Sequence, residues 1–226
     1  MCAWSIGLAL ALTACGENTG ADQSEAEAEL EEPLPVMGPE RTVLAFGDSL
    51  FAGYQLKTEE GYPERLENAL RAQGVNARVI DAAVSGDTTA AGRQRLPFVL
   101  DNLSEAPDLA LVELGGNDLL RGLPPAETRA NLEAIITELQ RRDIPVLLMG
   151  LRAPPNAGVP YQKEFDAVFP ALAKAYDLKF IPFWVESLVG RYDLRLTDRI
   201  HPTAEGVELL VADTIDEVKA AIPEAD

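Results

Sequence analysis

Short apolar runs recur along the chain from residue 41 onward, and each run ends at polar residues or glycine. They are too short for helices and are rich in Leu and β-branched residues, which is typical of strands that are buried on both faces of a sheet. We therefore predict five strands, at residues 42–46, 78–84, 109–114, 145–149 and 179–183.

Longer segments with apolar residues at helical spacing lie between and after these runs. They predict helices at residues 62–73, 89–103, 126–142, 162–177 and 204–221. Strand and helix alternate five times, which favours a parallel sheet covered by helices. The predicted fold class is therefore α/β, as one three-layer α/β/α domain at residues 41–226.

The first 40 residues have a different pattern. Residues 3–14 form an apolar run that is too short to span a membrane and is typical of the hydrophobic part of a signal peptide. The LTAC motif that ends at Cys15 resembles the lipobox of bacterial lipoproteins, in which cleavage precedes a cysteine that is then lipidated. We expect a lipoprotein signal peptide at 1–14 and a lipid anchor at Cys15, which would hold the protein in the bacterial cell envelope, facing the periplasm. No Lys or Arg precedes the apolar run, and a plain signal peptide with a chance cysteine is the alternative.

A strongly acidic segment separates this region from the predicted domain. Residues 1–40 contain eight acidic residues and no Lys or Arg, and they include Pro33, Pro35 and Pro39. A segment with this charge and without apolar periodicity buries too little surface to offset the entropy of ordering it. We therefore expect a disordered tether at 15–40; the alternative, an exposed charged helix, would be ended by the prolines.

Charge and composition exclude several classes of function. The net charge of −18 argues against nucleic acid as a partner, and no stretch has the roughly 20 apolar residues that a membrane-spanning helix needs. The two cysteines lie at positions 2 and 15, and His201 is the one histidine. The predicted domain therefore has no cysteine nucleophile and no zinc site built from His and Cys, and we expect neither metal nor cofactor. A monomer is expected.

Polar residues follow the predicted strands where those strands end. Ser49, Gly86 and Asn117 follow the first three strands, while Asp198 and His201 precede the last helix. Ligands bind at the carboxyl ends of parallel strands, so these residues are expected to lie together.

Their chemistry matches the requirements of acyl transfer. A serine needs a base to become a nucleophile, His201 is the one imidazole available, and Asp198 could orient it. Three donors could stabilise an oxyanion: the backbone amides of Ser49 and Gly86 and the side-chain amide of Asn117. Ser85 also lies at a strand end and remains a rival nucleophile at this stage.

Four sequence blocks carry a resemblance to a known family. The blocks LAFGDSLFAGY, AAVSGDTTAAG, LVELGGNDLLRG and TDRIHP resemble the signature blocks of the SGNH (GDSL) hydrolases, in particular the thioesterase I, lysophospholipase L1 and arylesterase branch. The likeness extends over nearly all of residues 42–221. It implies a flavodoxin-like sheet of five parallel strands, a triad of Ser49, Asp198 and His201, and an oxyanion hole formed by Ser49, Gly86 and Asn117. It also favours Ser49 over Ser85 as the nucleophile.

The resemblance further implies an acyl groove edged by two loops, at residues 119–124 and 151–160. The apolar candidates for substrate contact are Leu119, Leu120, Leu123, Ala153 and Pro154. Ordinary loop packing is the alternative interpretation of each of them. A residue as small as Ala153 offers little contact to a long acyl chain, which favours short and medium acyl groups.

We therefore expect a lipid-anchored serine esterase that acts on aryl, alkyl or lipid esters through an acyl-serine intermediate, with thioesterase and lysophospholipase activity as extensions. One alternative is a carbohydrate O-acetylesterase of the envelope that uses the same triad. The other is a binding lipoprotein without activity, which would have no need of all three triad residues.

Overall fold

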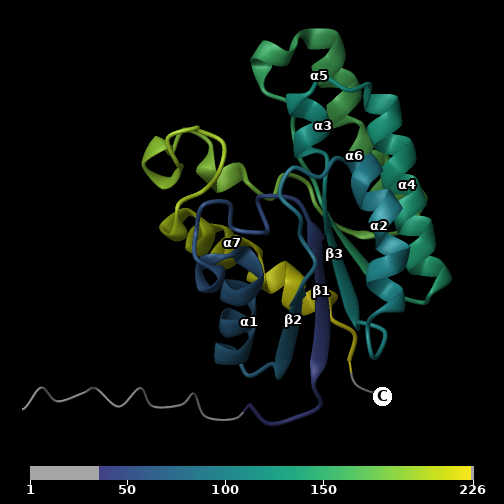
Figure 1. Cartoon of the computed structure of the whole chain (residues 1–226), viewed down its shortest axis with the longest axis vertical. Helices are drawn as coiled ribbons and strands as arrows, with labels where there is room; N and C mark the ends of the chain where they lie inside the picture. The colour runs from purple at the N-terminus through teal and green to yellow at the C-terminus, as the bar shows by residue number, and fades with distance from the viewer. Residues whose placement is uncertain (1–35, 225–226) are drawn as a thin grey trace, which may run out of the picture. The chain divides into compact units, whose positions relative to one another are not determined.

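A computed structural model of the chain describes residues 36–224. The predicted signal peptide, Cys15 and most of the predicted tether lie outside the described residues. Five strands form one parallel sheet in the order β2-β1-β3-β4-β5, which confirms the predicted α/β class (Figure 1). The strands are β1 Arg41–Gly47, β2 Ala77–Asp81, β3 Leu109–Glu113, β4 Val146–Met149 and β5 Lys179–Ile181.

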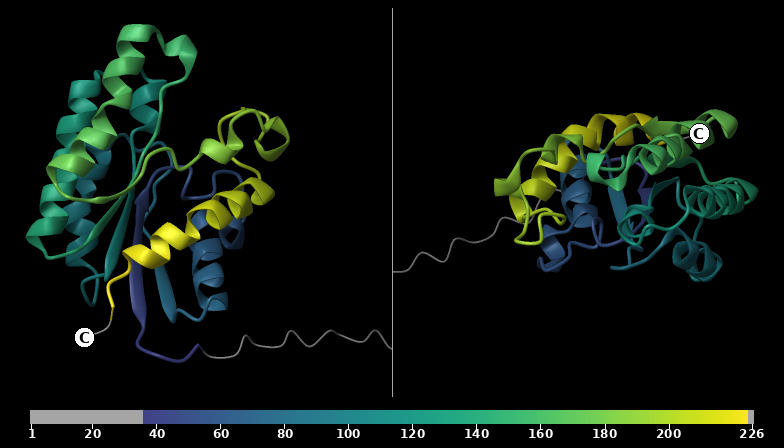
Figure 2. Two further views of the ribbon diagram at one scale, coloured as in Figure 1. Left: turned by 180° about the vertical axis from the view of Figure 1, so that it is seen from behind. Right: turned by 90° about the horizontal axis from the view of Figure 1, so that it is seen from above.

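Helices cover both faces of this sheet. The α-helices are α1 Tyr62–Ala72, α2 Thr89–Asp101, α3 Gly116–Leu120, α4 Pro125–Arg141, α5 Val159–Asp166, α6 Val168–Ala175 and α7 Ala204–Ala221. Helices α1 and α7 pack together on one face, while α2, α4 and α6 lie on the other (Figures 1 and 2). No helix among the described residues is long and apolar enough to cross a membrane.

The predicted elements differ from the structure in several respects. The helix predicted at 162–177 is two helices, α5 and α6, which meet at Ala167. Strands β2 and β5 are only partly buried, because they form the edges of the sheet and each lacks a neighbour on one side. The second strand ends at Asp81, three residues earlier than predicted. The short helix α3 was not predicted.

The core determines where the site can lie. Strands β1, β3 and β4 are buried between the helical layers, and Gly47 at the end of β1 pairs in register with Glu113 at the end of β3. Beneath this edge, Phe51 stacks on Tyr62 at 4.7 Å between ring centroids, and Trp184 packs edge-on against both rings. The loops that follow β1 and β3 therefore begin next to each other, beside this buried aromatic cluster of Phe51, Tyr62 and Trp184.

Candidate active site

Three of the predicted site residues form one continuous chain of hydrogen bonds. His201 Nε2 lies 2.8 Å from Ser49 Oγ, although the two residues are 152 positions apart in the sequence. On the other side of the ring, His201 Nδ1 lies 2.7 Å from Asp198 Oδ2. Among the described residues, no hydrogen bond joins His201 to Ser85, the rival nucleophile. The arrangement can remove a proton from the Ser49 hydroxyl and stabilise the imidazolium that results.

The loop before α7 holds the acid and the imidazole in place. Asp198 Oδ1 accepts hydrogen bonds from the backbone N–H groups of Ile200 and His201, at 2.8 and 3.0 Å. The N–H of Leu196 donates to the carbonyl of His201 at 2.8 Å, which closes the loop. The ring of Tyr54 lies 4.4 Å from the imidazole, between centroids, and covers one of its faces. Both ends of the imidazole and one of its faces are therefore constrained.

The electrostatics of Asp198 suit this arrangement. Partial burial would raise the pKa of its carboxyl, but the hydrogen bonds from the His201 ring and from the backbone of Ile200 and His201 outweigh that effect. The net result is a pKa below the usual value for Asp. The carboxylate therefore stays charged at neutral pH and can accept the hydrogen bond from the imidazole.

Hydrogen bonds from the sheet edge organise the turn that carries Ser49. The carboxyl of Asp48 accepts the N–H of Leu50 at 3.1 Å and the side-chain amide of Asn117 at 3.0 Å. Burial raises the pKa of Asp48 to about 6, although these hydrogen bonds oppose the shift. Asp48 therefore links the loop after β1 to the loop after β3 and fixes the orientation of the Asn117 amide.

Two backbone amides at this edge are free to act as donors. Among the described residues, no acceptor pairs with the N–H of Ser49 or of Gly86. Gly86 has φ of +88°, in the left-handed region that favours glycine. Its carbonyl accepts a hydrogen bond at 2.9 Å from Arg121 at the end of α3. This hydrogen bond joins the loop after β2 to the end of α3, the helix that carries Asn117.

The predicted substrate-contact residues have unequal exposure. Leu120 is 60% exposed and Pro154 is exposed, while Leu119 and Leu123 are partly buried. Ala153 is only 4% exposed, and its backbone pairs with the side chains of Asp166 and Gln162. Leu120 and Pro154 can therefore meet a ligand from solvent, whereas Ala153 offers it little surface.

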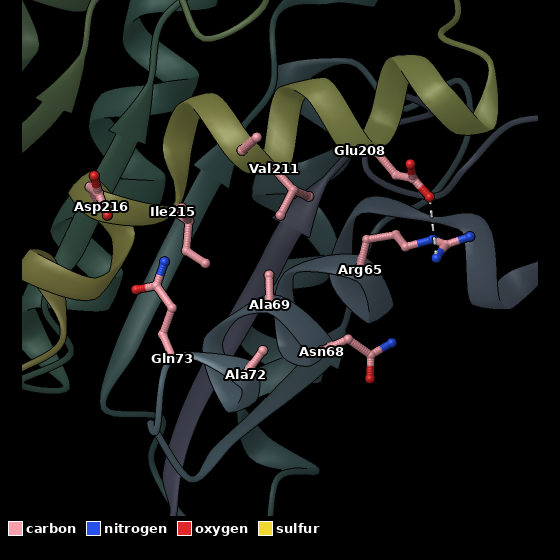
Figure 3. A pocket seen from close by; sticks show the side chains of 10 residues that line it. Arg65, Asn68, Ala69, Ala72, Gln73, Glu208, Val211, Ile215 and Asp216 are labelled. Carbon is pink, nitrogen blue, oxygen red and sulfur yellow. Dashed lines mark ion pairs between the residues drawn. The ribbon is translucent and has the colours of Figure 1, made fainter. Parts of the chain in front are cut away.

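The large cavity between α1 and α7 contains none of the predicted site residues (Figure 3). It has a volume of about 660 Å³ and is lined by side chains such as Ala69, Val211 and Ile215, with the ion pair of Arg65 and Glu208 at one side. Within residues 36–224, no group of three or more His, Cys, Asp or Glu side chains is arranged to hold a metal ion.

Sequence reasoning missed four residues that shape the site. All four lie inside the quoted blocks: Asp48 is next to Ser49, Glu113 lies four residues before Asn117, Tyr54 ends one block, and Arg121 is the second-to-last residue of another. Their position within those blocks was the available signal. Their contacts join loops that are far apart in the sequence, so local patterns could not reveal them.

A serine, an imidazole and a carboxylate in hydrogen-bonded series at the carboxyl edge of an α/β sheet define a serine hydrolase. The chain matches the GDSL-like Lipase/Acylhydrolase family over residues 45–209 and belongs to that family.

Similar proteins include curated enzymes and a solved structure. The arylesterase of Vibrio mimicus is 39% identical over 163 residues, which cover 72% of this chain and 80% of that protein. Thioesterase 1/protease 1/lysophospholipase L1 of Escherichia coli K12 is 37% identical over 164 residues, which cover 73% of this chain and 76% of that protein. The protein in the crystal structure of AlinE4, an SGNH-hydrolase family esterase, has 61% sequence identity to this chain. The two structures superpose with a TM-score of 0.70, and the match covers 83% of this chain and all of that one.

Proposed function

We propose that this protein is a serine esterase in which Ser49 is the nucleophile, His201 the general base and Asp198 the residue that orients the imidazole. The observation that carries the proposal is the unbroken hydrogen-bond chain from Asp198 through His201 to Ser49. A binding protein has no need of such a chain, so its presence favours catalysis over simple binding.

The proposed reaction has two halves. His201 takes the proton of Ser49 as Oγ attacks the carbonyl carbon of the ester, and it then gives this proton to the departing alcohol. Water attacks the acyl-serine in the second half, again with His201 as the base. His201 takes a proton from this water and returns it to Ser49 Oγ as the acyl–oxygen bond breaks, which frees the carboxylic acid and regenerates the serine. In both halves, negative charge develops on the carbonyl oxygen, and the N–H groups of Ser49 and Gly86 and the amide of Asn117 are the donors that would stabilise it.

Two structures of esterase AlinE4 variants support these roles. One variant replaces a serine and the other an aspartate, and those two positions are as far apart in that chain as Ser49 and Asp198 are in this one. The identity of 60% between each variant and this chain makes the correspondence specific.

The proposed substrates are aryl and alkyl esters with short to medium acyl groups. The similarity to an arylesterase and to a thioesterase and lysophospholipase supports this class, with thioesters and lysophospholipids as further substrates. Leu120 and Pro154 are the exposed apolar residues that we propose contact the acyl chain.

A comparison of Ser49→Ala with Ser85→Ala tests the proposal. The full chain is assayed on p-nitrophenyl esters from acetyl to palmitoyl. We expect wild type and Ser85→Ala to hydrolyse them with an optimum among the shorter chains, and Ser49→Ala to lose activity at least about 10³-fold. Loss of activity in Ser85→Ala with retention in Ser49→Ala would overturn the assignment of the nucleophile.

We also propose export and lipid anchoring, with a signal peptide at 1–14, a lipidated Cys15 and a tether at 15–40 that leads to the hydrolase domain at 41–226. The apolar run, the LTAC motif and the acidic composition of the segment support this organisation. Intact-mass analysis of membrane-extracted protein is expected to show an acylated N-terminal Cys15. An unmodified N-terminus downstream of residue 15 would refute it.

A further inference from the structure

Glu113 is a buried carboxyl beside the site that the proposed reaction does not use. It is the last residue of β3, pairs in register with Gly47, and has no exposed surface. Its Oε2 accepts the backbone N–H of Asp48 at 3.2 Å. The residue that follows Asp48 is Ser49, so this bond holds the chain one residue before the proposed nucleophile.

The local backbone is shaped to admit this side chain. A Cβ at Gly47 would lie 2.9 Å from Glu113 Oε2 and 2.8 Å from the ring of Phe51, closer than such atoms approach in proteins. Glycine at this position therefore allows the carboxyl to come up against the end of β1. The buried aromatic cluster of Phe51, Tyr62 and Trp184 packs beside the Glu113 side chain and keeps it away from solvent.

No positive charge balances Glu113. Among the described residues, no Lys, Arg or His forms an ion pair with it, and its titratable neighbours are Asp48 on the Ser49 turn and Tyr62 on α1. Burial, and then the charge of Asp48, hold the pKa of Glu113 well above the usual range. Two buried carboxyls this close cannot both be ionised cheaply, and Asp48 is the one with hydrogen bonds that favour its charge.

We propose that Glu113 is a positioning residue that remains uncharged and, through its hydrogen bond to the N–H of Asp48, fixes the turn carrying Ser49. The inference rests on the proposed function, because it assigns Glu113 a role in that same site. Its consequence is geometric: the Ser49 hydroxyl and the free Ser49 N–H, both needed in the transition state, keep their place relative to His201 and Asn117.

Two substitutions at position 113 separate the effect of side-chain length from the effect of side-chain charge. Glu113→Gln keeps the length of the side chain and an oxygen that accepts the Asp48 N–H, but it cannot ionise. Glu113→Asp keeps an ionisable carboxyl but is shorter by one methylene and cannot reach the same N–H without a shift of the backbone. A displacement of about 1 Å at a reacting group is enough to cost about 10²-fold in rate.

The experiment measures kcat and KM of the full chain on p-nitrophenyl butyrate from pH 5 to 9, with the folded fraction of each variant from circular dichroism. We expect Glu113→Gln to keep kcat within about 3-fold of wild type, with the same pH profile. We expect Glu113→Asp to lose about 10²-fold in kcat per folded molecule with KM changed by less than about 3-fold, as for loss of a transition-state interaction.

Three results would overturn the proposal. A loss in Glu113→Gln as large as in Glu113→Asp would show that a charged carboxylate is required. Normal kcat in Glu113→Asp would show that the hydrogen bond does not position Ser49. A pH profile displaced in Glu113→Gln alone would show that Glu113 ionises in the working range. None of these results affects the esterase assignment itself, which depends on wild-type activity and its loss in Ser49→Ala.

Discussion

Replacing Asp48 by Asn is expected to stabilise the protein increasingly as the pH rises, while lowering its activity. Asp48 is 1% exposed, and burial raises the pKa of its carboxyl from 3.8 to about 6. The folded state therefore binds a proton more tightly than the unfolded chain does. The proton on Asp48 contributes its full stabilisation only well below the unfolded-state pKa of 3.8, and this contribution is lost as the pH rises through the folded-state pKa of about 6.

The size of the effect follows from this shift. The difference between 3.8 and about 6, at 1.36 kcal/mol per pH unit, corresponds to a total loss of about 3 kcal/mol in the free energy of unfolding, counted from well below the lower pKa to well above the higher one. Asparagine cannot ionise, so Asp48→Asn avoids this loss. Activity should fall because an amide at position 48 can place an N–H group opposite the Asn117 amide, which now donates to the carboxyl of Asp48.

Urea unfolding of both proteins at pH 4.5, 6 and 7.5 measures the effect. Most other titrating groups are common to both chains and cancel in the difference between them. The stability of Asp48→Asn relative to wild type should rise by about 2 kcal/mol between pH 4.5 and pH 7.5, with most of the rise below pH 6. A difference that stays constant, or falls with pH, would refute the argument that Asp48 is ionised at a cost in the folded protein.

Three further substitutions test other parts of the site and core. Asn117→Ala is expected to lower kcat by about 10²-fold with little change in KM, as measured on p-nitrophenyl esters, because one oxyanion donor is lost. Arg95 bonds Asp87 and the carbonyls of Ala82 and Gly47, so Arg95→Ala should reduce the free energy of unfolding by about 2–3 kcal/mol in urea titrations. Gly92→Ala places a Cβ against Leu114 Cδ1 in the core, and overpacking there should cost about 1–3 kcal/mol, detected as a lower Tm. Unchanged kcat, urea midpoint or Tm, respectively, would contradict each expectation.

The strand pattern predicted the fold class, and the polar strand ends predicted that Ser49, Asp198 and His201 lie together, while the choice of Ser49 over Ser85 needed the family resemblance. Those features are local in the sequence, and parallel-sheet topology converts them into proximity. The role of Glu113 could not be predicted in this way, because an acidic residue at the end of an apolar run is equally compatible with exposure. The burial of Glu113 depends on Gly47 and on the aromatic cluster that includes Trp184, a residue from a distant part of the chain.

The join at Ala167 was missed for a related reason. Both halves of the predicted helix are apolar on one side, and the periodicity hardly changes across the break. The acyl groove was also predicted from apolar residues alone. Sequence does not show that Ala153 is buried and hydrogen-bonded to side chains of α5, while Leu120, a few residues after Asn117, is exposed.

The separation of 152 positions between Ser49 and His201 has a consequence for the newly made chain. A ribosome produces the serine two residues after it completes β1, but the imidazole and the acid follow only after all five strands have been synthesised. Until then the serine has no base, and the growing polypeptide cannot attack cellular esters. The serine can gain its base only after the loop before α7 has been made and has placed His201 beside Ser49.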